Sequence, residues 1–122
     1  MNISVIIPTY NRKEVLFRAI DSVLKQSFVV KEIIIVDDGS TDSGLSIARK
    51  YENKYENVKV EAQKNSGAPV ARNRAFELST GEYIQYIDAD DLLHPDKIRL
   101  QMEILKAADD RTLVFGRWGT FQ

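Results

Sequence analysis

The sequence predicts an α/β protein with an open, mostly parallel, Rossmann-like sheet and flanking helices. Two observations predict this class. Apolar runs of strand length alternate with segments of helical periodicity along the chain. The run Glu32–Asp37 is also apolar throughout its centre, which is typical of a parallel strand that is covered on both faces. Strands separated by helices form right-handed βαβ units, and these units build such a sheet.

The first strand and the first helix are predicted from local patterns. Ile3–Ile7 is an apolar run, and Pro8 ends the predicted strand because proline cannot donate a ladder hydrogen bond. Asn11 and Glu14 have the spacing of a capping box. We therefore expect Asn11 to cap a helix that extends to about Gln26.

The middle of the chain continues the alternation. Gly39–Asp42 is a turn sequence that also offers caps for a helix over Ser43–Glu52. Asn57–Glu61 places Val58 and Val60 on one face, which predicts a short strand at an edge of the sheet.

The last third of the chain adds two helices and two strands. A helix is expected over Val70–Leu78, with Gly81 as its left-handed cap. Glu82–Ile87 is the fourth predicted strand. Pro95 begins a further helix, and Thr112–Trp118 is expected to form a last strand.

Composition excludes several classes of function. The chain has 122 residues, the size of one domain, and its 17 basic and 18 acidic side chains give a net charge of −1, so bulk nucleic-acid binding is not expected. It has no cysteine and one histidine, which excludes thiolate and histidine-rich metal sites. Neither a signal peptide nor a transmembrane segment is visible. We expect a cytoplasmic protein, or one that lies peripherally at the inner membrane face.

Polar side chains follow four of the predicted strands. In open α/β sheets, ligands bind beyond the carboxyl ends of the strands at the point where strand order reverses. A binding site is therefore expected there. The polar segments are Pro8–Asn11, Asp37–Ser40, Asn65–Gly67 and Asp88–Asp91.

The most specific signal in the sequence is a group of three aspartates within four residues: Asp88, Asp90 and Asp91. Carboxylates this close in sequence repel one another unless they are fully solvated or share a cation. Oxygen ligands without histidine or cysteine favour Mg²⁺ or Mn²⁺. The alternative is an acidic cluster that is stabilised by the dipole of the helix beginning at Pro95. The four residues Asp88–Asp91 alone favour neither the metal site nor this helix-dipole cluster.

Three further residues indicate a nucleotide. Asp38 ends the second strand, where an acidic residue commonly binds a sugar or base, although the same segment also reads as a turn that leaves Asp38 free. Arg72, near a helix start, favours an anion, although it could be a solvated surface residue. Tyr10 could stack on a base. A diphosphate could enter so acidic a pocket only with a bridging divalent cation.

Four segments of the chain resemble, in order and spacing, the motifs of family 2 glycosyltransferases with the GT-A fold. The similarity covers nearly the whole chain. It implies inverting transfer of a sugar from a nucleotide diphosphate, most often UDP, to a hydroxyl of a carbohydrate or glycolipid acceptor, in polysaccharide assembly. The segments are Ile3–Arg12, Val36–Asp42, Asn65–Asn73 and Gly81–Asp91.

The resemblance also implies roles for nucleotide-binding residues. Pro8, Thr9 and Tyr10 would line the nucleoside pocket. Asp38 would accept a hydrogen bond from the base, and Arg72 would approach the diphosphate. The family's strand order would place the first strand beside the fourth.

The implied metal site is acidic. Asp90 would bind Mg²⁺ or Mn²⁺, and Asp88 would lie near the ribose, with Asp88 and Asp91 as further candidate metal ligands. Asp91 either joins the metal or caps the following helix.

The catalytic base is not identified. In the family it lies in the acceptor-binding portion, and no acid after Asp91 matches its motif, so the base is expected beyond Gln122. Residues 1–122 are then a truncated GT-A domain, the nucleotide-sugar-binding portion without the acceptor-binding portion, expected to bind donor without turnover. The alternatives are a non-catalytic nucleotide-sugar or metal-binding module and, on the likeness of Ile34–Asp38 to an acidic pocket, a receiver-type phosphoacceptor domain.

Overall fold

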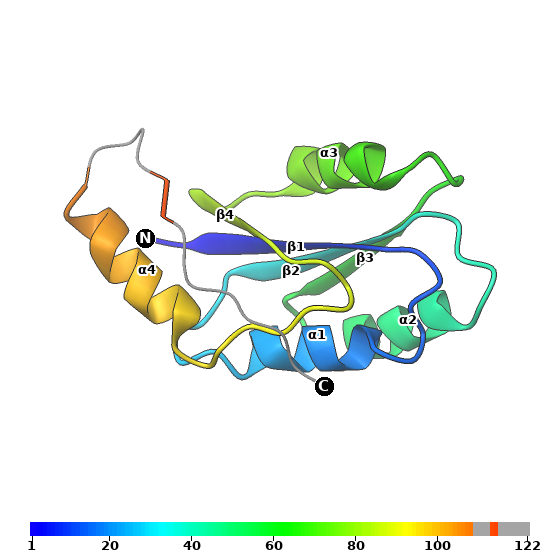
Figure 1. Cartoon of the computed structure of the whole chain (residues 1–122), viewed down its shortest axis with the longest axis horizontal. Coiled ribbons are helices and arrows are strands. Elements are labelled where there is room, and N and C mark those ends of the chain that lie inside the picture. The colour runs from blue at the N-terminus through cyan, green and yellow to red at the C-terminus, as the bar shows by residue number, and fades with distance from the viewer. Residues whose placement is uncertain (109–112, 115–122) are drawn as a thin grey trace.

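The computed structural model describes residues 1–108 and 113–114, and in this part of the chain strands and helices alternate as predicted (Figure 1). The elements, in order, are β1 (Ile3–Thr9), α1 (Leu16–Leu24), β2 (Glu32–Asp37), α2 (Gly44–Lys54), β3 (Val58–Ala62), α3 (Ala68–Leu78), β4 (Tyr83–Tyr86) and α4 (Lys97–Lys106). The strand predicted for Thr112–Trp118 lies outside the described residues, apart from Leu113 and Val114.

The sheet is parallel and has the order β3-β2-β1-β4. β3 is therefore an edge strand and β1 lies beside β4, as the sequence and the family resemblance predicted. Figure 1 shows α3 on one face of the sheet and α1 and α2 on the other. Because both faces are covered, every residue of β1 and β2 is buried.

Each face of the sheet packs its own apolar cluster. On the α3 face, Ile6, Ile34 and Val36 contact Ala71 and Ala75, whose small side chains let α3 lie close to the strands. The cluster on the opposite face is larger, and alternate apolar residues of β1 and β2 contribute to it. Its central residues are Val5, Ile7, Leu16, Ala19, Ile20, Val23, Ile33, Ile35, Ile98 and Met102.

The prediction that Pro8 ends the first strand is wrong, since β1 continues to Thr9. Alternate residues of β1 face β4, and Ile6 is the last of them to be paired, with its carbonyl accepting from Ile87 N at 3.0 Å. Pro8 faces the same side, where β4 has already diverged, so its missing N–H removes no ladder hydrogen bond. On the other side, Thr9 O still accepts from Asp38 N at 2.9 Å.

The predicted cap at Asn11 is also wrong. α1 begins only at Leu16 and has no side-chain cap, and Asn11 adopts a positive φ of 51° outside the helix. Its side chain instead bonds to the loop after β2, as described below. The other turn is confirmed only in part: Asp42 Oδ1 accepts from Gly44 N at 2.8 Å where α2 begins, but the N-cap residue Ser43 makes no side-chain capping hydrogen bond.

Gly81 does not form a left-handed cap, because α3 ends with Ser79 in an extended conformation and Gly81 is not among the glycines with positive φ. Its role is close approach. A Cβ at Gly81 would lie 2.7 Å from Ser4 N and 3.0 Å from Ile3 C, so only glycine lets this connection pass beside β1.

Buried Gln26 attaches α4 to the end of α1. Its Nε2 donates to His94 O at 2.7 Å, and its Oε1 accepts from Ile98 N at 3.1 Å.

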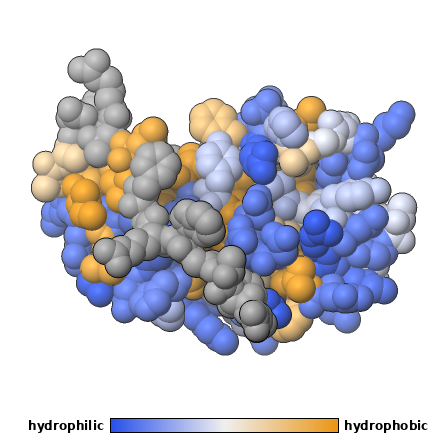
Figure 2. Space-filling model, in the orientation of Figure 1, coloured by the Kyte–Doolittle hydropathy of each residue, from blue (hydrophilic) through white to orange (hydrophobic). Residues whose placement is uncertain are grey.

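Apolar surface gathers at the left-hand end of the molecule in Figure 2, which is the end where α4 lies in Figure 1. Leu100 and Ile104 of α4 are exposed. Within the described residues, no helix has the length and apolarity that crossing a membrane requires.

Glu32 ties the amino ends of the strands together. It is 2% exposed and accepts from Lys59 Nζ at 2.8 Å, Ser4 Oγ at 2.6 Å and Thr80 N at 2.6 Å. Burial opposes its ionisation, but these hydrogen bonds outweigh burial and lower the pKa of Glu32 to about 2. The ionised carboxylate of Glu32, which is in β2, therefore joins this strand to β1, β3 and the α3–β4 connection.

Gly81→Ala should destabilise the protein by about 1–3 kcal/mol, because its methyl group meets backbone atoms of β1 that cannot move independently. Urea unfolding measures this. Gly44→Ala is the matched control, since its nearest neighbour is the movable side chain of Asp42 at 2.9 Å. Equal losses in the two variants would contradict the close-approach argument.

Glu32→Gln should remove part of the acid sensitivity of folding. With a folded pKa of about 2 against an ordinary value of 4.5, Glu32 stabilises the fold above about pH 5 and loses this contribution as pH falls toward 2. We expect a loss of roughly 2–3 kcal/mol at pH 7 and a flatter acid limb of unfolding free energy against pH. Parallel curves for wild type and variant would contradict this, and exposed Glu103→Gln serves as control.

Candidate functional site

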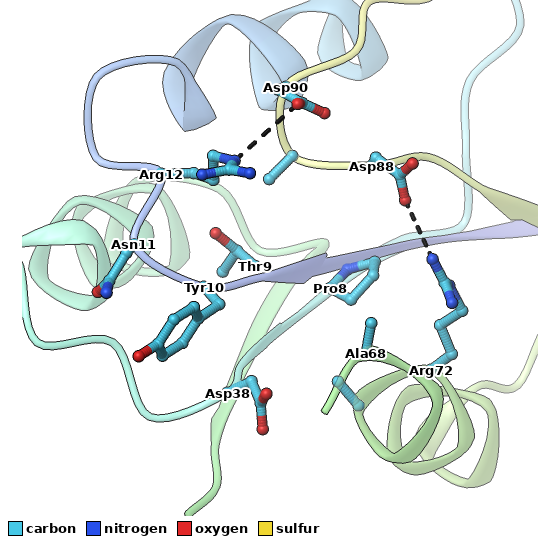
Figure 3. A pocket seen from close by; sticks show the side chains of 12 residues that line it. Pro8, Thr9, Tyr10, Asn11, Arg12, Asp38, Ala68, Arg72, Asp88 and Asp90 are labelled. Carbon is cyan, nitrogen blue, oxygen red and sulfur yellow. Dashed lines mark hydrogen bonds and ion pairs between the residues drawn. The ribbon is translucent and has the colours of Figure 1, made fainter. Parts of the chain in front are cut away.

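A cavity of about 510 Å³ opens at the carboxyl ends of β1, β2 and β4 (Figure 3), where the strand order reverses. Every residue that the family resemblance assigns to the nucleotide lines it. Of the three candidate metal ligands, Asp88 and Asp90 line it and Asp91 does not. The full lining is Pro8, Thr9, Tyr10, Asn11, Arg12, Asp38, Ala68, Ala71, Arg72, Asp88, Ala89 and Asp90.

Small side chains, which carry no motif signal in the sequence, leave the cavity open. Ala68 and Ala71 belong to the first turns of α3, and Ala89 separates two aspartates. Tyr10, 44% exposed, projects beside Asp38 (Figure 3). An exposed ring with open space next to it can stack on a planar group.

As predicted, the side chain of Asp38 is not used in the turn before α2, but it is held by other hydrogen bonds. It is 4% exposed, and its Oδ1 accepts from Gln63 Nε2 at 2.8 Å and from Ser66 N at 2.7 Å. Its Oδ2 accepts from Gly67 N at 2.9 Å. Burial would raise the pKa of Asp38, but these hydrogen bonds outweigh it and hold the pKa below the ordinary value.

These hydrogen bonds position the start of α3. Gly67 precedes the helix at a φ of 99°, which favours glycine, and its N–H points at the Asp38 carboxylate. Asp38 thus already places a negative charge near the positive end of the helix dipole. It thereby holds the helix that positions Arg72.

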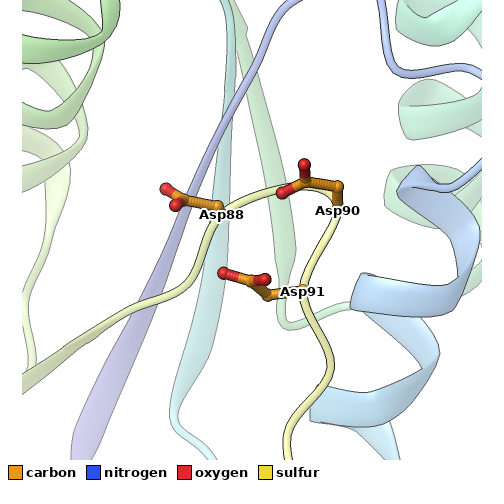
Figure 4. A group of neighbouring side chains, drawn as sticks. All are labelled: Asp88, Asp90 and Asp91. Carbon is orange, nitrogen blue, oxygen red and sulfur yellow. The ribbon is translucent and has the colours of Figure 1, made fainter. Parts of the chain in front are cut away.

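Asp88, Asp90 and Asp91 converge (Figure 4): one carboxylate oxygen from each lies within 4.8 Å of the others, and all three residues are exposed. Although Asp91 is exposed, neighbouring atoms remove part of the water around its carboxyl group. This loss of solvation, together with the charges of Asp88 and Asp90, raises the pKa of Asp91. Asp91 does not cap α4, because that helix begins at Lys97 after Asp96. The helix-capping reading of Asp91 is therefore wrong.

Two arginines face the carboxylates. Arg72 Nη2 lies 3.3 Å from Asp88 Oδ1, and Arg12 Nε lies 3.9 Å from Asp90 Oδ2 (Figure 3). Arg12 was missed from the sequence because nothing local distinguishes an arginine after a strand from a solvated one. Both pairs are about half exposed, so each contributes little to folding.

Asn11 joins the loops after β1 and β2. Its side-chain Oδ1 accepts from Thr41 N at 2.8 Å, and its backbone N–H donates to Ser40 Oγ at 2.9 Å. Asparagine tolerates the left-handed backbone better than most residues, which suits the φ of 51°. This contact holds one rim of the cavity.

The family model described as "Glycosyl transferase family 2" matches residues 4–122. The chain belongs to this family. This agrees with the resemblance that its motifs predicted, and it sets aside the receiver-type reading.

Known relatives are longer glycosyltransferases. The poly(ribitol-phosphate) beta-glucosyltransferase of Bacillus spizizenii is 46% identical over 97 residues, which are 76% of this chain and 15% of the relative. S. aureus TarS, solved in complex with UDP-GlcNAc, superposes with a TM-score of 0.79 at 37% identity, covering 88% of this chain and 32% of that one.

A more distant structure is the mannosyltransferase PcManGT from Pyrobaculum calidifontis, solved in complex with GDP-Man and Mn²⁺. It superposes with a TM-score of 0.71 at 27% identity, covering 88% of this chain and 32% of the other. The chain thus spans less than half the length of each of these relatives.

The acidic cluster of this glycosyltransferase chain fits a hard divalent cation. Its three ligand oxygens are carboxylate oxygens, they are accessible, and they converge without a bulky group between them. The arginines beside Asp88 and Asp90 already partly compensate their charge.

Asn11→Ala should destabilise the protein by about 1–3 kcal/mol, because it removes the acceptor for Thr41 N and leaves a residue that disfavours the left-handed backbone. Denaturant unfolding measures the loss. Asn11→Asp keeps an acceptor oxygen at the same place, so it should lose less than half as much. Equal losses would show that the contact between the loops contributes nothing.

Proposed function

We propose that residues 1–122 are the nucleotide-sugar-binding portion of an inverting, metal-dependent glycosyltransferase. The donor is a nucleotide diphosphate sugar, with UDP as the nucleotide, and the acceptor is a hydroxyl of a carbohydrate or glycolipid. The observation that carries the proposal is the convergence of Asp88, Asp90 and Asp91, of which Asp88 and Asp90 line one end of a cavity whose other residues suit a nucleoside. The complex of TarS with UDP-GlcNAc supports the choice of donor.

The nucleoside lies at the end of the cavity formed by Tyr10 and Asp38. The ring of Tyr10 stacks on the base, and Asp38 accepts a hydrogen bond from it, with Pro8 and Thr9 forming the wall between them. The diphosphate then extends toward Asp88 and Asp90, on the opposite side of β1 in Figure 3.

Charge determines how the diphosphate binds. Arg72 is a pocket-lining cation on α3, and its guanidinium can bind two phosphate oxygens at once. The neighbouring carboxylates repel phosphate, so binding requires Mg²⁺ or Mn²⁺ held by Asp90 with Asp88 and Asp91. When bound, such an ion acts as a Lewis acid that stabilises the departing nucleoside diphosphate. The Mn²⁺ complex of PcManGT supports this assignment.

Inversion also requires a base on the acceptor hydroxyl, opposite the leaving group. Of the pocket-lining carboxylates, Asp88 and Asp90 are assigned to the metal and Asp38 already accepts three protein hydrogen bonds, so none of them is assigned as the base. The base is therefore expected from outside them, in an acceptor-binding portion. Retained donor binding without sugar transfer by residues 1–122 would agree with this division, whereas steady transfer would contradict it.

Titration calorimetry of UDP with Mn²⁺ and with a chelator tests the metal assignment. UDP should bind at least about tenfold more tightly with Mn²⁺, and Asp90→Asn should remove most of this difference. Glu103→Gln, an exposed carboxylate on α4, should leave it unchanged. Metal-independent affinity, or an Asp90→Asn variant that behaves like wild type, would refute the proposed site.

A further inference from the structure

Gln63 lies behind Asp38 and reaches the cavity only through it. It follows β3, where its backbone N–H donates to Asp37 O at 2.9 Å and its Nε2 donates to Asp38 Oδ1 at 2.8 Å. Gln63 does not line the cavity, but Asp38 does. Anchored at both backbone and side chain, Gln63 fixes the orientation of the carboxylate in front of it.

The hydrogen bonds to Asp38 leave one acceptor position open. A carboxylate has roughly four lone-pair positions, and Oδ1 uses two of them for Gln63 and Ser66. Oδ2 accepts from Gly67 and retains one position. Held by three donors, the ionised group can accept a further hydrogen bond but cannot donate one.

We propose that Gln63 is a positioning residue that determines which nucleobase the cavity accepts. By presenting Asp38 as a fixed acceptor, it selects a base with a ring N–H on its pairing edge, as in uracil, against one with a ring acceptor there, as in cytosine. The inference rests on the proposed function, because it requires that Asp38 faces the base. Gln63 itself touches no part of the donor.

A glutamate at this position would change the chemistry of the site. Two carboxylates at hydrogen-bond distance share one proton, because both cannot ionise so close together. The shared proton lets the pair donate as well as accept. The other charged and titratable side chains that line the same cavity are unchanged by the substitution: Tyr10, Arg12, Arg72, Asp88 and Asp90.

Binding of UDP and CDP in the presence of Mn²⁺, measured by calorimetry for the whole chain, tests the inference. Wild type should prefer UDP by about tenfold or more, and Gln63→Glu should reduce this preference to about threefold or less. Gln63→Leu, which adds no charge, should lower UDP affinity about tenfold and CDP affinity much less. Gln85→Glu loses a similar hydrogen bond, 2.7 Å to Tyr86 O, away from the cavity, and should change neither affinity.

The ratio of the two affinities separates positioning from simple damage to the fold. A merely structural role for Gln63 would weaken UDP and CDP equally in both variants, and that outcome would overturn the inference. Should Gln63→Glu fail to fold, an unchanged ratio in Gln63→Leu would overturn it alone. A wild type that binds neither nucleotide refutes the proposed function as well, whereas a wild type that prefers UDP while both variants keep the preference refutes only the role of Gln63.

Discussion

The position of β1 between β2 and β4 is the constraint on which the rest of the structure depends. Because all three strands are parallel, their carboxyl ends meet at one edge, and the strand order reverses between β1 and β4. β1 can hold this place only if it is apolar on both faces, as Val5, Ile6 and Ile7 make it. The same requirement that builds the core therefore also creates the cavity.

Loop contacts, rather than the core, give the cavity its walls. Asp38 fixes the start of α3 through Ser66 and Gly67, and Asn11 fixes the loop before α2 through Thr41. Each contact joins segments that are distant in sequence but follow neighbouring strands. The sheet brings the strand ends together, and single polar side chains then determine how the loops are held.

The strands, the helices and the acidic cluster could be predicted because their signals are local: apolar periodicity, and aspartates a few residues apart. Predictions failed where a residue's partner comes from another segment. The spacing of Asn11 suggested a cap, but its acceptor oxygen meets Thr41 instead. Gly81 suggested a left-handed turn, but it is glycine because Ser4 lies against it. Arg12 and Gln63 carried no local signal, since only the fold brings them to Asp90 and Asp38.

Burial divides the carboxylates of this protein into two kinds. Glu32 and Asp38 are almost fully buried, with pKa values lowered by fixed hydrogen bonds, so losing a partner would leave a charge unsatisfied. Asp88 and Asp90 are exposed, and their arginine partners are held by weak, solvent-screened contacts. A cation can displace such partners at little cost. Buried Asp38 therefore shapes the site and buried Glu32 the opposite end of the sheet, whereas Asp88 and Asp90 remain available to exchange one positive partner for another.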